Sequence, residues 1–380
     1  MLVNLNQVLV PAKKNHYAVG SFNAVNMELA RGIINAAECS RSPVIMGTAE
    51  VLFPYGPLEE VSDYLIPMAK KANVPVVIHL DHGLNKETCI KALELGFSSI
   101  MYDCSTDPYE VNVEKVREMA EIAHSYGATI EGELGHVGDN EGSAEGSSHL
   151  ADPSKYFTDP KMAKDYVQKT GVDALAIAVG NAHGAYKLPP KLDFERIRNI
   201  ANTVDVPLVL HGDSGLTDND FRQAIKEGIS KVNIFTDINV AMVKAEFSKF
   251  SDMNKGIIDL IPAAVEAVKQ ETLAKMKLFS SAGKAVYPSG NEVCQRTNKV
   301  QNIALSQEGI QKNNGGCDMG MQLMIPKDPV MLLSFLNMKL RDFYTDLSAL
   351  CEDLDLQEQE IKDKLATIGY VYDREKNQFV

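Results

Sequence analysis

The distribution of apolar residues along the chain predicts an alternation of buried strands and amphipathic helices. Short apolar runs recur, and they lack the apolar–polar alternation of a half-exposed strand. Such runs are typical of parallel strands that are buried on both faces. Eight of them occur, at residues 17–24, 42–49, 74–82, 98–105, 128–137, 173–180, 206–214 and 231–237.

Helical patterns separate these runs. Lys86–Leu95, Val111–Tyr126 and Asp218–Glu227 have the spacing of amphipathic helices. Several helical patterns end at a glycine, which is typical of a helix C-terminus; these are Gly96, Gly127, Gly171 and Gly228. Eight strand–helix units in this order predict an α/β fold, the (β/α)8 TIM barrel. A doubly wound open sheet is the alternative, although it usually has fewer strands.

Polar and ionisable residues stand at the C-terminal ends of the apolar runs. In a TIM barrel these ends meet at one face, where the active site lies. A single residue of this kind is readily explained as a structural cap, but three histidines and several carboxylates at one face indicate a functional site. The residues are Asn23, Thr48, Asp81, His82, Asp103, Glu131, Glu133, His183, His211, Asn233 and Asp237.

Three of these residues predict a metal site. His82, His183 and His211 end the third, sixth and seventh runs. Imidazoles from separate strands can converge on one Zn²⁺ and leave an open coordination position for a substrate carbonyl. The prediction depends on the barrel, because three dispersed histidines alone are a weak metal signal. His79 is predicted to be a hydrogen-bond partner of this site.

Asp81 directly precedes His82. Adjacent residues of a regular strand point to opposite faces, so Asp81 can join the site only if the strand bends near Gly83. A carboxylate beside a metal is suited to proton transfer with a hydroxyl group. A turn or a helix N-cap is the alternative role for Asp81.

Small residues follow the strands that carry the histidines. Gly184 comes after His183, and His211 is followed by Gly212-Asp213-Ser214-Gly215. Loops after the seventh and eighth strands of this fold commonly bind phosphate, because small residues expose backbone N–H groups. Simple turn chemistry is the alternative.

Composition narrows the classes of function. The 380 residues carry a formal charge of −13, which argues against nucleic acid and anionic membranes as partners. No apolar run approaches the roughly 20 residues of a membrane span, and the N-terminus lacks the pattern of a signal peptide. The six cysteines lack paired spacing. We therefore expect a cytoplasmic protein.

A series of motifs carries a resemblance to a known family. Residues 1–285 resemble the class II, zinc-dependent ketose-bisphosphate aldolases, which include fructose- and tagatose-bisphosphate aldolases. The motifs are HLDHG (79–83), GFSSIMYDCS (96–105), EGELG (131–135), TGVDALAIAVGNAHGAY (170–186), LVLHGDSGL (208–216), GISKVNIFTD (228–237) and LFSSAGKA (278–285).

The resemblance implies a lyase that cleaves a phosphorylated ketose into dihydroxyacetone phosphate and an aldehyde. It implies that His82, His183 and His211 hold a catalytic Zn²⁺. Asp81 would exchange the proton of the C4 hydroxyl, and Glu141 would handle the proton at C3. No lysine Schiff base is required. Family members are usually dimers or tetramers, so a homodimer or homotetramer is expected.

The resemblance also implies roles around this centre. Asp103 and Glu133 match positions linked to a second metal site, for a divalent or a monovalent cation. The substrate, a small phosphorylated sugar, would contact residues at the ends of several strands. The predicted substrate-binding residues are Asn23, Gly184, Gly212, Asp213, Ser214, Asn233, Phe235 and Thr236.

Some positions depart from the family pattern. Asp213 and Asp139 stand where the family usually has small residues, Cys104 replaces another small residue, and Phe235 makes the end of the eighth strand bulkier. A carboxylate in a phosphate loop repels phosphate unless it points away or meets a cation. Two alternatives therefore stay open: an aldolase for a substrate without this phosphate, and a non-catalytic metal-binding barrel with a regulatory C-terminal module.

The C-terminal part differs from the barrel. Residues 286–323 are rich in Asn, Gln and Gly and are predicted to be a linker. Residues 324–380 are predicted to form a small α+β module, with helices at Val330–Asp342 and Glu358–Ala366 and a hairpin at Tyr370–Val380. This module resembles a small uncharacterised bacterial domain. Oligomer contacts or docking of a partner are its expected uses.

Overall fold

The computed structural model describes two compact units, Met1–Gly290 and Asn291–Val380. In the first unit it describes residues 1–135, 138–139, 157–183, 191–212, 215–249 and 256–285, with residues 138–139 and 182–183 described by their backbone only. In the second it describes residues 332–333, 336–337, 340, 344, 346–353, 356–374 and 376–379. Each unit has its own buried core.

Eight parallel strands of the first unit close into a barrel. Their order around the barrel is β4-β3-β2-β11-β10-β8-β6-β5, and pairing of β4 with β5 closes the ring. Each predicted apolar run overlaps one of them, so the predicted (β/α)8 fold is confirmed. The strands are β2 (Val19–Asn23), β3 (Val44–Ala49), β4 (Val76–Gly83), β5 (Ser99–Tyr102), β6 (Thr129–Leu134), β8 (Ala174–Ile177), β10 (Leu208–Leu210) and β11 (Ile229–Ile234).

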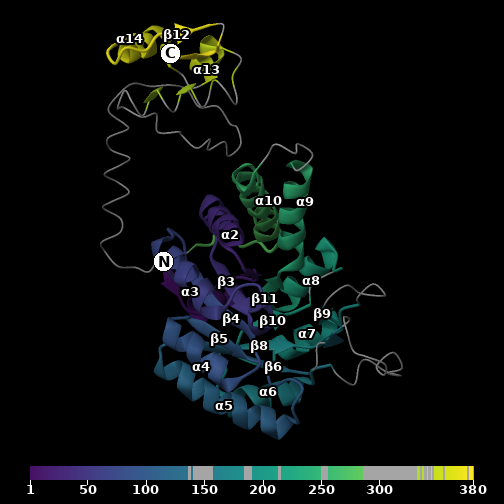
Figure 1. The fold of residues 1–380 in the computed structure, drawn as a ribbon. Helices are drawn as coiled ribbons and strands as arrows, with labels where there is room; N and C mark the ends of the chain where they lie inside the picture. The colour runs from purple at the N-terminus through teal and green to yellow at the C-terminus, as the bar shows by residue number, and fades with distance from the viewer. Residues whose placement is uncertain are drawn as a thin grey trace, which may run out of the picture. The chain divides into compact units, whose positions relative to one another are not determined.

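Helices surround the strands (Figure 1). Two of the helices predicted from the sequence, α4 and α8, have the predicted bounds, whereas α5 begins two residues earlier, directly after Pro108. Gly96, Gly171 and Gly228 are C-caps with positive φ, as expected. Gly127 follows the C-cap of α5 by one residue. The helices are α2 (Met27–Ser40), α3 (Leu58–Lys71), α4 (Lys86–Leu95), α5 (Tyr109–Ser125), α6 (Pro160–Thr170), α7 (Phe194–Ala201), α8 (Asp218–Glu227), α9 (Thr236–Lys249) and α10 (Ile257–Leu278).

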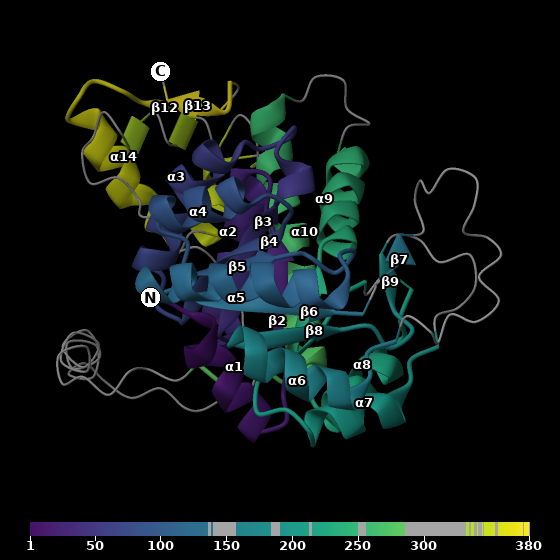
Figure 2. The same ribbon diagram turned by 90° about the horizontal axis from the view of Figure 1, so that it is seen from below.

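The packing distinguishes the two ends of the barrel. α4 and α5 lie on the outer side of β5 and β6 (Figure 2), and α10 packs against both α2 and α9 (Figure 1). A separate apolar cluster joins α1 (Leu5–Lys14) to the barrel interior, where Leu5 and Leu9 pack with Ile45 and Val77. This cluster fills the end at which the strands begin. Polar side chains are therefore left for the opposite end, where the strands finish.

The second unit is a small α+β module. Leu332, Leu336 and Leu340 are buried at helical spacing inside the first predicted helix. The second predicted helix, α14 (Glu358–Ala366), and the predicted hairpin, in which β12 (Tyr372–Asp373) pairs with β13 (Gln378–Phe379), are confirmed. α13 (Leu347–Asp353) completes the described elements. In neither unit is any described helix both long enough and apolar enough to pass through a bilayer.

A chain that ends at Ala285 is expected to keep the barrel folded. The Ala285 N–H still donates to the Arg41 carbonyl, and Phe279, which is fully buried, keeps its packing on Phe221. The thermal unfolding midpoint, followed by circular dichroism, should stay within about 3 °C of the barrel transition of the full chain. A control chain that ends at Leu278 loses Phe279 and should melt at a lower temperature. An insoluble fragment ending at Ala285 would contradict the expectation.

Candidate active site

The end of β4 has an irregular backbone. Its pairing register with β5 shifts between Leu80 and Gly83, and His82 has a φ of +43°, in the left-handed region. The bend that the sequence required is therefore present, and Asp81 and His82 point toward the same space. Only glycine fits at position 83, because a Cβ there would lie 2.6 Å from Cys89 Sγ.

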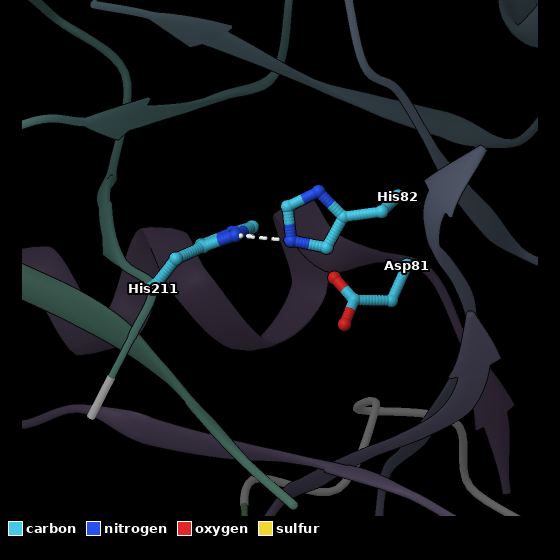
Figure 3. Close-up of side chains that lie close together, drawn as sticks. All are labelled: Asp81, His82 and His211. Atoms are coloured by element: carbon cyan, nitrogen blue, oxygen red, sulfur yellow. Dashed lines mark hydrogen bonds between the residues drawn. The ribbon is translucent and has the colours of Figure 1, made fainter. Parts of the chain in front are cut away.

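Two imidazole rings meet at the mouth of the barrel. His82 Nε2 lies 2.8 Å from His211 Nδ1, and the Asp81 carboxylate lies beside them (Figure 3). The other nitrogen of each ring has a carboxylate partner: His82 Nδ1 lies 2.7 Å from Asp103 Oδ2, and His211 Nε2 lies 2.8 Å from Glu131 Oε1. Each outer carboxylate favours a proton on the nitrogen that faces it, so the inner nitrogens present their lone pairs to one another. A proton or a metal ion between the two inner nitrogens would satisfy both lone pairs.

Asp81 is held as an anion between two amides. Its Oδ2 accepts a hydrogen bond from Asn23 Nδ2 and its Oδ1 accepts one from Asn233 Nδ2, each at 2.8 Å. Burial opposes ionisation of Asp81, but the nearby His82 and His211 rings outweigh it and lower the pKa of the carboxyl below its usual range. Asp81 is therefore an ionised, oriented carboxylate that can accept a proton.

Beneath the imidazoles lies a buried ion pair between Glu131, one of the predicted strand-end residues, and Lys231, which the sequence reasoning did not assign to the site. Lys231 Nζ donates to Glu131 Oε2 at 2.7 Å, and both side chains are fully buried. Burial opposes ionisation of Glu131, but Lys231 and His211 outweigh it and lower the pKa of the carboxyl to about 2. His79, the predicted hydrogen-bond partner of the site, instead contacts Ser99 Oγ at 2.8 Å and lies 3.9 Å from Glu131. Burial lowers the pKa of His79 to about 3, so this ring is neutral.

Replacing Lys231 by methionine is expected to lower the free energy of unfolding by about 3 kcal/mol, because Glu131 would keep a buried charge without its partner. Urea denaturation of the metal-free chain measures this loss. Lys115→Met provides the control, since the Lys115–Asp107 pair is exposed and its removal should leave the midpoint unchanged. Equal midpoints for the two variants would contradict the expectation.

A second cluster of possible metal ligands shares His82. The donor atoms of His82, Asp103 and Glu133 lie within 4.8 Å of one another, as do those of Asp81, His82 and His211. Burial opposes protonation of His82, but Asp81 and Asp103 outweigh it and raise the pKa of the ring to about 10. The carboxylates thus strongly favour positive charge at this position. Imidazole nitrogens and carboxylate oxygens are common zinc ligands, so the donor set fits zinc.

The structure brings together most of the predicted site residues that it describes. The convergent ones are Asn23, Asp81, His82, Asp103, Glu133, His211 and Asn233. Gly212 directly follows His211 and has a φ of +64°. Phe235 and Thr236 lie at the start of α9 and line a cavity of about 400 Å³ together with Asn239, Val240, Val243 and Lys244.

Other predicted residues fall outside this description. The backbone of His183 lies in β9 (Ala182–His183), where it pairs with Asp139 of β7 (Gly138–Asp139), but its side chain lies outside the described residues. Glu141, Gly184, Asp213 and Ser214 also lie outside them. Their assignments stay predictions.

Comparisons with known proteins agree with both resemblances found in the sequence. Residues 3–284 match the family model described as class-II fructose-bisphosphate aldolase, and residues 326–379 match a domain of unknown function, DUF4250.

The uncharacterized protein YdjI of Escherichia coli K12 is 38% identical over 286 residues, which cover 75% of this chain and 100% of YdjI. The crystal structure of the YdjI aldolase from Escherichia coli K12 superposes with a TM-score of 0.68 at 36% identity, again covering 75% of this chain and 100% of that one. A fructose-bisphosphate aldolase of Geobacillus stearothermophilus is 37% identical over 290 residues, covering 75% of this chain and 99% of the relative.

Proposed function

Because this chain belongs to the class-II fructose-bisphosphate aldolase family, whose members are carbon–carbon lyases, we propose that it is a zinc-dependent aldolase that cleaves a phosphorylated ketose. Fructose 1,6-bisphosphate and tagatose 1,6-bisphosphate are the model substrates. The products are dihydroxyacetone phosphate and an aldehyde. The Geobacillus relative, which is named a fructose-bisphosphate aldolase, supports this substrate class.

One observation carries the proposal. Two imidazole nitrogens face each other at 2.8 Å beside an ionised carboxylate, and a separate carboxylate holds the far side of each ring. This arrangement supports a zinc site formed by His82 and His211, with His183 as the proposed third ligand. Zinc bound there would supply a Lewis acid for the oxygens of the ketose.

The chain's own residues supply the proton transfers. Asp81 accepts the proton of the C4 hydroxyl as the C3–C4 bond breaks, which turns that oxygen into the aldehyde carbonyl. The amides of Asn23 and Asn233 orient the carboxylate for this step. Glu141 then donates a proton to C3 of the three-carbon fragment, which leaves as dihydroxyacetone phosphate.

Phosphate recognition is assigned to the ends of the last strands. We propose Gly184, Gly212, Ser214, Asn233 and Thr236 as the residues that bind the phosphate and hydroxyl groups. Asp213 stands where the family usually has a small residue, and its negative charge favours one alternative, an aldolase whose substrate lacks this phosphate.

Proton exchange separates these possibilities. The purified full chain, loaded with zinc, is incubated in deuterated water with dihydroxyacetone phosphate or with dihydroxyacetone, and exchange is followed by NMR. Exchange with the phosphate ester supports the proposal, and a screen of phosphorylated ketoses then identifies the substrate. Exchange with the unphosphorylated triose alone would support the alternative. Zinc binding without exchange of either triose would overturn aldol chemistry at this site.

Three further assignments are proposed. A location in the cytoplasm is proposed from the composition of the chain. Assembly into a homodimer or homotetramer is proposed from the family resemblance, and the molar mass in solution tests it. The metal cluster Asp103–Glu133–His82 is proposed as a site for a second cation.

A further inference from the structure

A carboxylate on the neighbouring strand reaches the turn that carries His82. β3 and β4 are parallel, and Ala49 pairs with Asp81, so the next residue, Glu50, comes level with His82. Glu50 begins a short 3₁₀ helix (Glu50–Leu52) at the mouth of the barrel. The sequence reasoning did not single out this residue, because a glutamate after a strand has the pattern of an ordinary surface residue.

The Glu50 carboxylate accepts hydrogen bonds from four donors of this turn. Oε2 accepts from the backbone N–H groups of Leu84 at 2.6 Å and of Asn85 at 3.2 Å. Oε1 accepts from Thr88 Oγ1 at 3.0 Å and from the side-chain amide of Asn85. Asn85 is the N-cap of α4, yet its side chain makes no capping hydrogen bond to the helix. The Glu50 carboxylate instead ties the two residues that precede α4 to the side chain of Thr88 in its first turn, where a negative charge also suits the helix dipole.

This contact matters because of the backbone at His82. A non-glycine residue with a φ of +43° is strained and persists only where its surroundings hold it. On one side the Gly83 carbonyl accepts a hydrogen bond from the Asp103 N–H at 2.9 Å. On the other side Glu50 holds the two residues that follow Gly83. We expect that the turn relaxes and the His82 ring moves away from His211 when Glu50 is removed.

We propose that Glu50 is a positioning residue for the metal centre, which holds the β4–α4 turn so that His82 keeps the orientation needed for metal binding. The proposal rests on the proposed zinc site. The hydrogen bonds of Glu50 go to Leu84, Asn85 and Thr88, so it acts on His82 through this turn.

The test compares two matched glutamates. Glu38 accepts hydrogen bonds from the backbone N–H and the side-chain amide of Asn73, as Glu50 does from Asn85, but it belongs to α2 at the other end of the barrel. Zinc affinity of the full chain is measured by competition with a chromogenic chelator. Glu50→Ala is expected to bind zinc about 10- to 100-fold more weakly than the wild-type chain, which is the usual effect of losing an outer partner of a metal site. The zinc affinity of Glu38→Ala should stay within about threefold of that of the wild-type chain.

A conservative variant and a spectrum complete the test. Glu50→Gln keeps the shape but has one acceptor oxygen instead of two, so its affinity should fall between those of Glu50→Ala and wild type. Cobalt(II) in place of zinc should show a changed visible absorption in Glu50→Ala and an unchanged one in Glu38→Ala.

Each outcome decides a different claim. Zinc affinity of Glu50→Ala equal to that of the wild type would overturn the positioning role and leave the proposed function intact. If Glu50→Ala does not fold, unchanged affinity in Glu50→Gln overturns it equally. A wild-type chain that binds no zinc would overturn the proposed function and this inference together.

Discussion

Replacement of His211 by alanine is expected to abolish zinc binding and aldol cleavage together. The ring supplies one of the two facing nitrogens, and no other described side chain can take its place 2.8 Å from His82 Nε2. Without the metal, the charge that develops on the ketose oxygens loses its main stabilisation, so kcat/KM should fall by roughly ten-thousandfold. Zinc content by atomic emission and steady-state cleavage of fructose 1,6-bisphosphate measure the two effects.

The fold should survive this change, because Lys231 still neutralises Glu131 after its imidazole partner is removed. His124→Ala is the matched control. His124 pairs with Asp173 and is half exposed, and its loss should change neither zinc content nor kcat/KM. Full zinc occupancy in His211→Ala would remove this residue from the proposed metal centre.

Replacement of Asp81 by asparagine should separate bond cleavage from metal binding. The amide has nearly the same shape but cannot accept the C4 hydroxyl proton, so kcat for cleavage should fall by about 10²- to 10⁴-fold. Proton exchange at the hydroxymethyl carbon of dihydroxyacetone phosphate, which is C3 of the ketose, is assigned to Glu141. This exchange should therefore continue in the variant. The zinc content should stay close to that of the wild-type chain. Coupled cleavage assays, NMR exchange and metal analysis on one preparation test all three expectations.

The three measurements also distinguish two roles for Asp81. Its carboxylate lies within 4.8 Å of the donor atoms of His82 and His211, so it is close enough to be a metal ligand itself. Lost zinc together with lost exchange would indicate a ligand, whereas retained zinc with lost cleavage indicates the base. Asp165→Asn, which changes an exposed carboxylate paired with Lys169, is the control and should leave all three readouts unchanged.

Much of the site was predictable from strand ends alone. Apolar runs that are buried on both faces indicate parallel strands, and the C-terminal ends of parallel barrel strands meet at one face. The convergence of Asp81, His82 and His211 follows from that rule, as do the contacts of Asn23 and Asn233 with Asp81. Gly83, next to His82, also indicated the bend that turns Asp81 into the site.

Other features could not be inferred from the chain. Glu131 and Lys231 are 100 residues apart, and each has the spacing of an inward-facing residue, but only closure of the barrel brings their charges to 2.7 Å. The role of Glu50 depends on the register of β3 with β4 and on the strained φ of His82. Neither the ion pair nor the role of Glu50 leaves a local pattern in the sequence, because strand register and side-chain contacts are set by packing between distant segments.

The amino-acid sequence by itself therefore determined the fold class, the face that carries the site and the residue types on it, because strand burial and strand order are local properties of the chain. The tertiary structure alone decided which nitrogen of each imidazole faces inward and which carboxylates hold the rings. Those choices depend on distances between side chains of different strands, and such distances exist only once the barrel has closed.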